Sequence, residues 1–221
     1  MTSRAVPAAL LLVALCGGAG FLIARLTAPG PDLRPLPATA RLPPPPEPAP
    51  PRRIPEHLPY LSLPDLAGTS HPLSEFAGHP LVVNFWATWC EPCRREIPLL
   101  EQARREGRES GLEVVGIALD SADNVAKYAK EAHLEYPIRV ADRQAFEAAS
   151  AFGMDAVLPF TVLADGRGNI LTLKVGELRR GELSVLLKAL LEVQAGRTSL
   201  AAARERLRRE LPGANAALDR P

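Results

Sequence analysis

The sequence predicts an α/β fold in which helices flank a central mixed sheet, and three observations lead to this prediction. Residues 80–85 are almost all apolar, which is typical of a strand buried on both faces of a sheet. Strand patterns and helix patterns alternate from about residue 61 to residue 193, which favours a partly parallel sheet. The turn at residues 165–169, Asp-Gly-Arg-Gly-Asn, makes the last two predicted strands an antiparallel pair.

The predicted elements follow one another in a regular order. A hairpin that turns at Gly68 opens the globular part. The strand at 80–85 leads into a helix that begins around Cys90 and runs to about Glu106, with Pro92 early enough to cost no helix bond. The remaining elements are a strand at 112–119, a helix at 123–134, an extended run at 136–140, a helix at 144–152, strands at 161–164 and 170–176, and a helix at 181–193.

Two cysteines stand where the buried strand gives way to the helix, in the sequence Trp-Cys-Glu-Pro-Cys. Cys90 lies where unpaired N–H groups and the positive end of the helix dipole favour a thiolate, so it is expected to be a nucleophile near neutral pH. Cys93 lies one turn further on the same side, so it can resolve a mixed disulfide formed by Cys90. The pair is therefore predicted to cycle between dithiol and disulfide.

A permanent structural disulfide and half of a zinc site are the alternatives for this pair. Zinc would need two further ligands, and the third cysteine, Cys16, lies in an apolar segment far from the pair. Three cysteines are too few for a disulfide scaffold, which favours a catalytic pair. No motif with metal-ligand spacing contains a histidine, so neither a metal nor a cofactor is expected; the histidines are His57, His71, His79 and His133.

Residues 84–98, Asn-Phe-Trp-Ala-Thr-Trp-Cys-Glu-Pro-Cys-Arg-Arg-Glu-Ile-Pro, resemble the active-site stretch of thioredoxin-like proteins of the TlpA/ResA type. Residues 156–168 resemble the cis-proline strand of that family and the turn that follows it. The resemblance implies a thioredoxin-like fold with an N-terminal hairpin and a βα insertion, here at residues 123–140. It also implies a cis peptide bond before Pro159 that faces the cysteine pair; the alternative is a trans proline at a strand edge.

The resemblance also points to a proton acceptor. Thioredoxins carry a buried aspartate six residues before the first cysteine, whereas this chain has Asn84, whose amide cannot take a proton in the same way. Glu96, which the TlpA/ResA group shares, is the implied replacement, because an apolar setting would raise its pKa and suit it to exchange protons with Cys93. An ordinary solvated glutamate of the helix is the alternative.

Two segments are predicted to precede the globular part. Residues 5–24 carry no charge, and about 20 apolar residues at about 1.5 Å each can cross a bilayer. Residues 1–28 are therefore predicted to form a membrane anchor or uncleaved signal, with a cleaved signal peptide and a lipoprotein attached at Cys16 as alternatives. Residues 29–59 contain 13 prolines, which favour a stiff polyproline II spacer over a folded structure.

The thioredoxin-like domain is predicted to span residues 60–194, and residues 195–221 to form a basic amphipathic helix with a tail. The helix is predicted at 199–211, and its apolar stripe is narrow, with arginines around it; the stripe is Leu200, Ala203, Leu207 and Leu211. Such a helix either docks on the domain or stays in solvent, or else it contacts a partner or anionic lipid.

These observations predict a membrane-tethered thiol:disulfide oxidoreductase that reduces disulfides in exported clients. Cys90 would attack, Cys93 would resolve, and Glu96 would assist proton transfer, while Pro159 and Trp89 would shape the docking surface. A net charge of +1 gives no field for nucleic acid. The alternatives are an oxidant that introduces disulfides and a copper-binding chaperone that uses the same sulfurs.

The resemblance implies the location and the partners. The protein is expected in the cytoplasmic membrane as a single-pass protein, with its catalytic domain on the periplasmic side. Its clients would be apocytochrome c thiols awaiting haem or copper-site proteins of an oxidase. A membrane electron carrier of the CcdA or DsbD kind would reduce it again.

Overall fold

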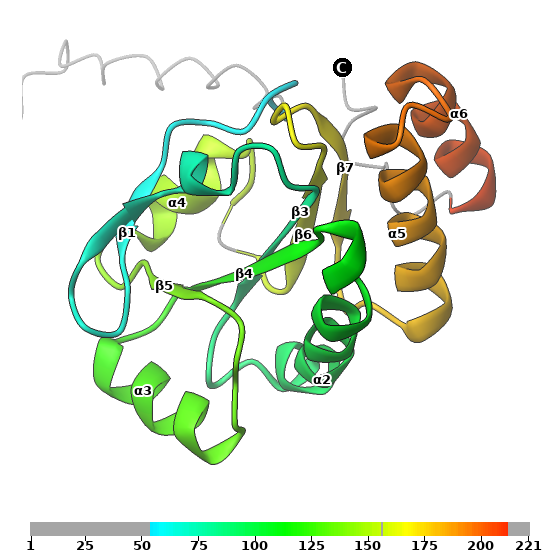
Figure 1. Cartoon of the computed structure of the whole chain (residues 1–221). Coiled ribbons are helices and arrows are strands. Elements are labelled where there is room, and N and C mark those ends of the chain that lie inside the picture. Colours follow the sequence, from blue (N-terminus) through cyan, green and yellow to red (C-terminus); the bar gives the residue numbers. More distant parts are fainter. Residues whose placement is uncertain (1–53, 156, 212–221) are drawn as a thin grey trace, which may run out of the picture. The chain divides into compact units, whose positions relative to one another are not determined.

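The computed structural model describes residues 54–155 and 157–211 (Figure 1). The predicted membrane anchor and most of the predicted proline-rich linker lie outside the described residues, as does the tail from residue 212. Within the two described ranges, none of the helices combines the length and apolar character needed to span a membrane.

A five-stranded mixed sheet forms the centre of the domain, in the order β5-β4-β3-β6-β7 (Figure 1). Its strands are β3 (Leu81–Trp86), β4 (Glu113–Ala118), β5 (Ile138–Val140), β6 (Phe160–Ala164) and β7 (Ile170–Val175). Strands β3, β4 and β5 run parallel, whereas β6 is antiparallel to both β3 and β7. The predicted mixed sheet is confirmed, including the antiparallel last pair.

The residues of β3 alternate between two cores, as the two-residue period of a strand requires. Val82 and Trp86 pack in the core on one face of the sheet, together with helix residues such as Ile97. Val83 and Phe85 pack in the core on the other face. All six residues of β3 are buried, which explains why the sequence at this strand is almost continuously apolar.

Helices cover both faces of the sheet (Figure 1). Three helices contribute to the core of Val82 and Trp86: α2 (Glu91–Glu106), α3 (Ala122–Glu131) and α5 (Arg180–Gln194). The opposite core receives helix α4 (Ala145–Ala151) and an N-terminal hairpin followed by a short 3-10 helix. The hairpin consists of β1 (Ser62–Pro64) and β2 (Ser70–Pro72), and the 3-10 helices are η1 (Leu73–Phe76) and η2 (Arg108–Ser110).

The predicted hairpin turn at Gly68 is confirmed. Gly68 has a φ of 84°, a left-handed conformation that glycine adopts without steric cost. The Asp65 carboxylate stabilises the turn, because its Oδ1 accepts hydrogen bonds from the N–H groups of Ala67 and Thr69, each at 2.9 Å. β1 and β2 pair in antiparallel fashion on either side of it.

The folded domain begins before residue 60, the predicted boundary with the linker. The N–H of Leu58 donates to the carbonyl of Gly168, and the N–H of Ile170 donates to the carbonyl of Glu56, both at 2.8 Å. Residues 54–59 therefore line the start of β7, which is the last strand of the sheet, and they satisfy backbone groups that an edge strand would leave open.

Helix α6 (Leu200–Glu210) docks on the domain, which is one of the arrangements predicted for it (Figure 1). Leu207 is fully buried in the same core as α2 and α5. Arg206 forms an ion pair with Glu192 of α5 at 2.7 Å, and Arg204 donates a hydrogen bond to the carbonyl of Ile170. Part of the basic character of α6 therefore serves contacts within the domain.

Gly116 lies in β4 beside Asn84 of β3, where a side chain has no room. A Cβ at this position would lie 2.7 Å from Trp86 Nε1 and 2.7 Å from Tyr136 Cε2, and both rings are buried. We expect Gly116→Ala to lower the free energy of unfolding by about 1–3 kcal/mol through overpacking, measured by urea denaturation.

Gly181→Ala is the matched control for this substitution. Gly181 lies in the first turn of α5, and a Cβ there would meet nothing within 4 Å. Alanine in a helix should leave the stability unchanged or raise it by about 0.4–1 kcal/mol. Equal effects of the two substitutions would contradict the steric explanation.

Candidate active site

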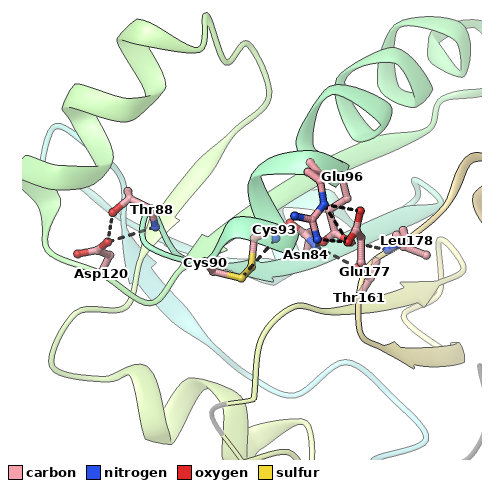
Figure 2. The surroundings of a disulfide bond; sticks show 10 residues. Asn84, Thr88, Cys90, Cys93, Glu96, Asp120, Thr161, Glu177 and Leu178 are labelled. Carbon is pink, nitrogen blue, oxygen red and sulfur yellow. Dashed lines mark hydrogen bonds and ion pairs between the residues drawn. A yellow bond between two sulfur atoms is a disulfide. The ribbon is translucent and has the colours of Figure 1, made fainter.

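Cys90 and Cys93 form a disulfide at the N-terminus of α2 (Figure 2). Cys90 is the N-cap of the helix, and its Sγ accepts a hydrogen bond from the N–H of Cys93 at 3.3 Å. Pro92 lies in the first turn, where its missing N–H leaves no helix bond unmade. Both cysteines are thus where the sequence predicts them.

The two cysteines differ in exposure to solvent. Cys90 is 5% exposed, whereas Cys93 is completely buried. Cys90 is therefore the cysteine that a client disulfide could reach, and the N–H groups at the head of α2 would stabilise a thiolate there. This asymmetry supports the predicted division of roles, in which Cys90 attacks and Cys93 resolves.

Glu96 is fully buried one turn after Cys93, and its carboxyl group is held by two donors (Figure 2). Oε1 accepts a hydrogen bond from Asn84 Nδ2 at 2.7 Å, and Oε2 accepts one from the N–H of Leu178 at 2.6 Å. Burial raises the pKa of Glu96 to about 7, although both hydrogen bonds favour the charged form and lower it. The alternative of a solvated helix glutamate is wrong, and the group can hold or release a proton near neutral pH.

The contacts of the Asn84 side chain explain why an asparagine stands where thioredoxins carry a buried aspartate. Its Nδ2 group donates both to Glu96 and to Oγ1 of Thr161, the latter at 3.0 Å. Thr161 is the partner of Asn84 in the β3–β6 ladder, so the two side chains share one face of the sheet. An aspartate at position 84 would place a second negative charge against Glu96, whereas asparagine supplies a donor.

The predicted cis bond before Pro159 is confirmed. Pro159 directly precedes β6, and the next residue, Phe160, pairs with Phe85 near the end of β3. The proline therefore lies at the end of the sheet from which the cysteine loop emerges. A trans proline, the alternative considered from the sequence, is wrong.

Exposed apolar side chains lie in the two loops at this end of the sheet. Trp89, directly before Cys90, is 69% exposed, and Val157, two residues before Pro159, is 53% exposed. Large apolar groups left open to water beside a reactive pair are suited to contact a client chain. The role of Trp89 and Pro159 in client docking stays a prediction, and their position at this end of the sheet is compatible with it.

Sequence reasoning missed Asp120, which lies in the loop after β4 (Figure 2). Its Oδ2 accepts hydrogen bonds from the N–H of Thr88, at 3.2 Å, and from the Thr88 hydroxyl. Oδ1 accepts from the N–H of Ser121 at 2.7 Å and from the Asn124 amide at 3.0 Å. Burial raises the pKa of Asp120, but these four hydrogen bonds outweigh it and hold the pKa below its usual value.

Asp120 thereby fixes the loop that leads to Cys90, because Thr88 lies two residues before Cys90. A signal for this role was present in the sequence. Asp120 directly follows the strand predicted at 112–119, and the carboxyl ends of neighbouring parallel strands meet at the same edge of a sheet.

Among the described residues, no group of three or more His, Cys, Asp or Glu side chains is placed to hold a metal ion. The ring nitrogens of His71 contact Glu75 at 3.0 Å and Asp65 at 3.2 Å, and Nδ1 of His79 contacts the carbonyl of Gly111. In that part of the chain, a copper-binding alternative would have to depend on the Cys90 and Cys93 sulfurs.

Comparison with known proteins agrees with this geometry. The family model described as Redoxin matches residues 53–190. The thiol-disulfide oxidoreductase ResA of Geobacillus thermodenitrificans is 32% identical over 133 residues, which are 60% of this chain and 75% of the relative. ResA of Bacillus thuringiensis subsp. konkukian is 29% identical over 136 residues, which are 61% of this chain and 77% of the relative.

Solved structures give the same result. A thiol:disulfide interchange protein of the thioredoxin family from Chlorobium tepidum superposes with a TM-score of 0.55 at 29% identity, over 62% of this chain and 97% of that one. A thiol-disulfide oxidoreductase from Bacteroides fragilis superposes with a TM-score of 0.54 at 26% identity, over 61% of this chain and 98% of that one. The family model matches more than half of this chain, and the pair Cys90–Cys93 stands at the head of α2. The chain therefore belongs to the Redoxin family and is a thiol-disulfide oxidoreductase of the ResA/DsbE type with a thioredoxin-like fold.

Proposed function

We propose that this protein reduces disulfide bonds in exported proteins, while tethered to the cytoplasmic membrane with its catalytic domain on the periplasmic side. The observation that carries the proposal is the buried carboxyl of Glu96, with a pKa of about 7, one helical turn from Cys93. A permanent structural disulfide is never protonated, so it needs no proton acceptor beside it. A dithiol that is deprotonated in every catalytic cycle needs one.

The reaction proceeds by two exchanges. In the reduced protein, the Cys90 thiolate attacks one sulfur of a client disulfide, which forms a mixed disulfide and releases the first client thiolate. Glu96 then takes the proton of the Cys93 thiol, and the Cys93 sulfur attacks Cys90. The mixed disulfide breaks, the second client thiolate leaves, and two electrons have moved from the protein to the client.

The surroundings of the pair support the remaining roles. Trp89 is exposed directly before Cys90, and Pro159 lies at the same end of the sheet, so both would hold the client chain. The uncharged segment at residues 5–24 supports a membrane anchor, and the proline-rich residues after it support a spacer between membrane and domain. The resemblance to the TlpA/ResA group favours apocytochrome c or copper-site proteins as clients, with re-reduction by a membrane carrier of the CcdA or DsbD kind.

The reduction potential tests the direction of electron flow. We would equilibrate the purified chain with glutathione or dithiothreitol buffers and measure the reduced fraction of Cys90 and Cys93 by thiol labelling. A reductant is expected to show a potential below about −200 mV. A value near about −120 mV would make the protein a disulfide donor and overturn the proposal.

A further inference from the structure

One of the two hydrogen bonds to Glu96 comes from a loop. Leu178 lies in the connection between β7 and α5, and its N–H donates to Glu96 Oε2 at 2.6 Å. The other donor, Asn84, lies in the centre of the sheet, where the ladders on both sides fix it. The loop has no such ladder. The buried Leu178 side chain and the bond from the Gly176 N–H to the Pro159 carbonyl at 2.8 Å hold part of it, and its polar contacts with α2 bear on where the Leu178 N–H lies.

Arg95 of α2 and Glu177 of the loop make one such contact, and each is the immediate chain neighbour of a residue in the Glu96–Leu178 hydrogen bond. Nε of Arg95 donates to both carboxylate oxygens of Glu177, at 3.0 and 3.1 Å, and Nη2 donates to Oε2 at 2.6 Å. Nη1 of Arg95 also donates to Glu91 one turn earlier, at 3.0 Å, which orients the guanidinium along the helix. The planar guanidinium of Arg95 thus binds both carboxylate oxygens of Glu177, a geometry that a lysine ammonium could not reproduce.

Two pairs of adjacent residues therefore meet. Residues 95 and 96 of α2 face residues 177 and 178 of the loop, with an ion pair on the outside and a hydrogen bond to the buried carboxyl on the inside. We propose that the Arg95–Glu177 ion pair is a positioning device, which keeps the Leu178 N–H on Glu96 and so sets how readily Glu96 releases its proton. This inference rests on the proposed role of Glu96 in the dithiol cycle.

The groups around Glu96 define the expected direction of the effect. Burial raises the pKa of Glu96 most; next in size, the Leu178 hydrogen bond lowers it, and then the Asn84 hydrogen bond does the same. The charge of Glu177 raises the pKa by less than the Leu178 bond lowers it, and the charge of Lys174 has a still smaller lowering effect. Several groups lie around Glu96, and Cys93 lies one turn earlier on the same helix. These groups are Asn84 and, beside it, Thr161 from the sheet, Tyr136 before β5, Lys174 from β7, and Glu177 and Leu178 from the loop.

The ion pair itself is partly exposed: the side chain of Arg95 is 51% exposed and that of Glu177 is 32% exposed. Such pairs contribute little to stability on their own. Breaking the pair should consequently change the titration of Glu96 far more than it changes the unfolding of the protein. That difference separates a positioning role from a merely structural one.

The test is the titration of the Glu96 carboxyl by ¹³C NMR in the oxidised full chain, with its resonance assigned by comparison with Glu96→Gln. We expect Arg95→Met to raise the pKa of Glu96 by about half a unit or more, because the loop donor is lost and Glu177 is left unpaired. The double variant Arg95→Met/Glu177→Gln is also expected to raise it, since losing the Leu178 bond outweighs losing the Glu177 charge.

Arg206→Met is the matched control, because it breaks an arginine–glutamate pair of similar length, Arg206–Glu192 at 2.7 Å, on α5 and α6. It should leave the Glu96 titration unchanged. An unchanged titration in Arg95→Met would overturn the proposal. A rise in the single variant with a fall in the double variant would also overturn it, because the charge of Glu177 would then be the cause.

The titration is independent of turnover, so it separates this inference from the proposed function. If the wild-type chain reduced no disulfide and the Glu96 titration still shifted as expected, the proposed function would fail while the positioning contact would stand. If the chain reduced disulfides and the titration did not shift, only the positioning contact would fail.

Discussion

Replacing Cys93 with serine is expected to abolish turnover and to leave the protein covalently joined to its client through Cys90. Cys90 is the N-cap of α2 and keeps some exposure, whereas Cys93 is fully buried behind it. Attack on a client disulfide therefore needs only Cys90, but release of the client needs Cys93. Without the Cys93 thiol, the mixed disulfide loses the resolving group beside it and should persist.

Two measurements check this result. The rate of reduction of a small disulfide protein such as insulin should fall to the level of the reaction without the protein in both Cys90→Ser and Cys93→Ser. On non-reducing gels, a covalent adduct with a disulfide-containing peptide should accumulate in Cys93→Ser and be absent in Cys90→Ser. Cys16→Ser, which removes the third cysteine of the chain, should behave as wild type. An adduct that formed through Cys93 would reverse the assigned roles.

The sequence was most informative where the controlling interactions are local. The strand β3, the start of α2 and the spacing of the cysteines depend on a short apolar run, an N-cap and an early proline, all within about fifteen residues of one another. The position of Glu96 follows from the same helix. Its burial could be expected only through the resemblance, because burial depends on the sheet and on the loop that cover it.

Element ends were less predictable where distant groups compete for the backbone. The helix predicted to end at residue 134 ends at Glu131. His133 then has a φ of 52°, a left-handed conformation that usually needs glycine, so nothing in the sequence indicated this helix end. The run predicted to extend from residue 136 pairs only from Ile138, since the N–H groups of Glu135 and Tyr136 donate to the side chain of Glu101. A side chain 34 residues away from Glu135 determines that boundary.

The remaining parts of the site share this limitation. Asp120 and Thr88 are 32 residues apart, and the contacts of Arg95 with Glu177 and of Glu96 with Leu178 each join residues 82 apart. A charged residue on a helix or in a loop has the same sequence pattern whether it is solvated or holds a catalytic loop. Only the fold brings these groups together.

Replacing Glu96 with glutamine is expected to slow the resolution of the mixed disulfide by roughly tenfold or more at pH 7 and to change its pH dependence. Glutamine keeps the size of the side chain, and its carbonyl oxygen can still accept a hydrogen bond from Asn84, but it cannot take the proton of Cys93. In the wild type, the rate should rise as Glu96 becomes a carboxylate around pH 7. In the variant, the rise should move toward about pH 8.5, the ordinary pKa of a thiol.

The measurement is the rate at which a preformed mixed disulfide at Cys90 decays, followed by quenched mass spectrometry from pH 5 to pH 9. Glu106→Gln is the control, because Glu106 lies at the other end of the same helix, far from the cysteines, and its side chain is exposed. It should follow the wild-type profile. Superimposable profiles of wild type and Glu96→Gln would remove Glu96 from the mechanism.

Stability gives an independent check of the same carboxyl. Because burial raises the pKa of Glu96 from its ordinary value of 4.5 to about 7, the folded protein binds a proton in a pH range where the unfolded chain has lost it. The stability associated with this proton is fully present below about pH 4.5 and is lost as the pH rises through about 7, by roughly 3 kcal/mol in total. The glutamine side chain does not titrate. The free energy of unfolding of Glu96→Gln, measured in urea, should therefore rise relative to that of the wild type between pH 5 and pH 8. Any hydrogen bond that glutamine fails to make lowers its stability equally at every pH, and the difference in slope therefore reports the buried proton alone.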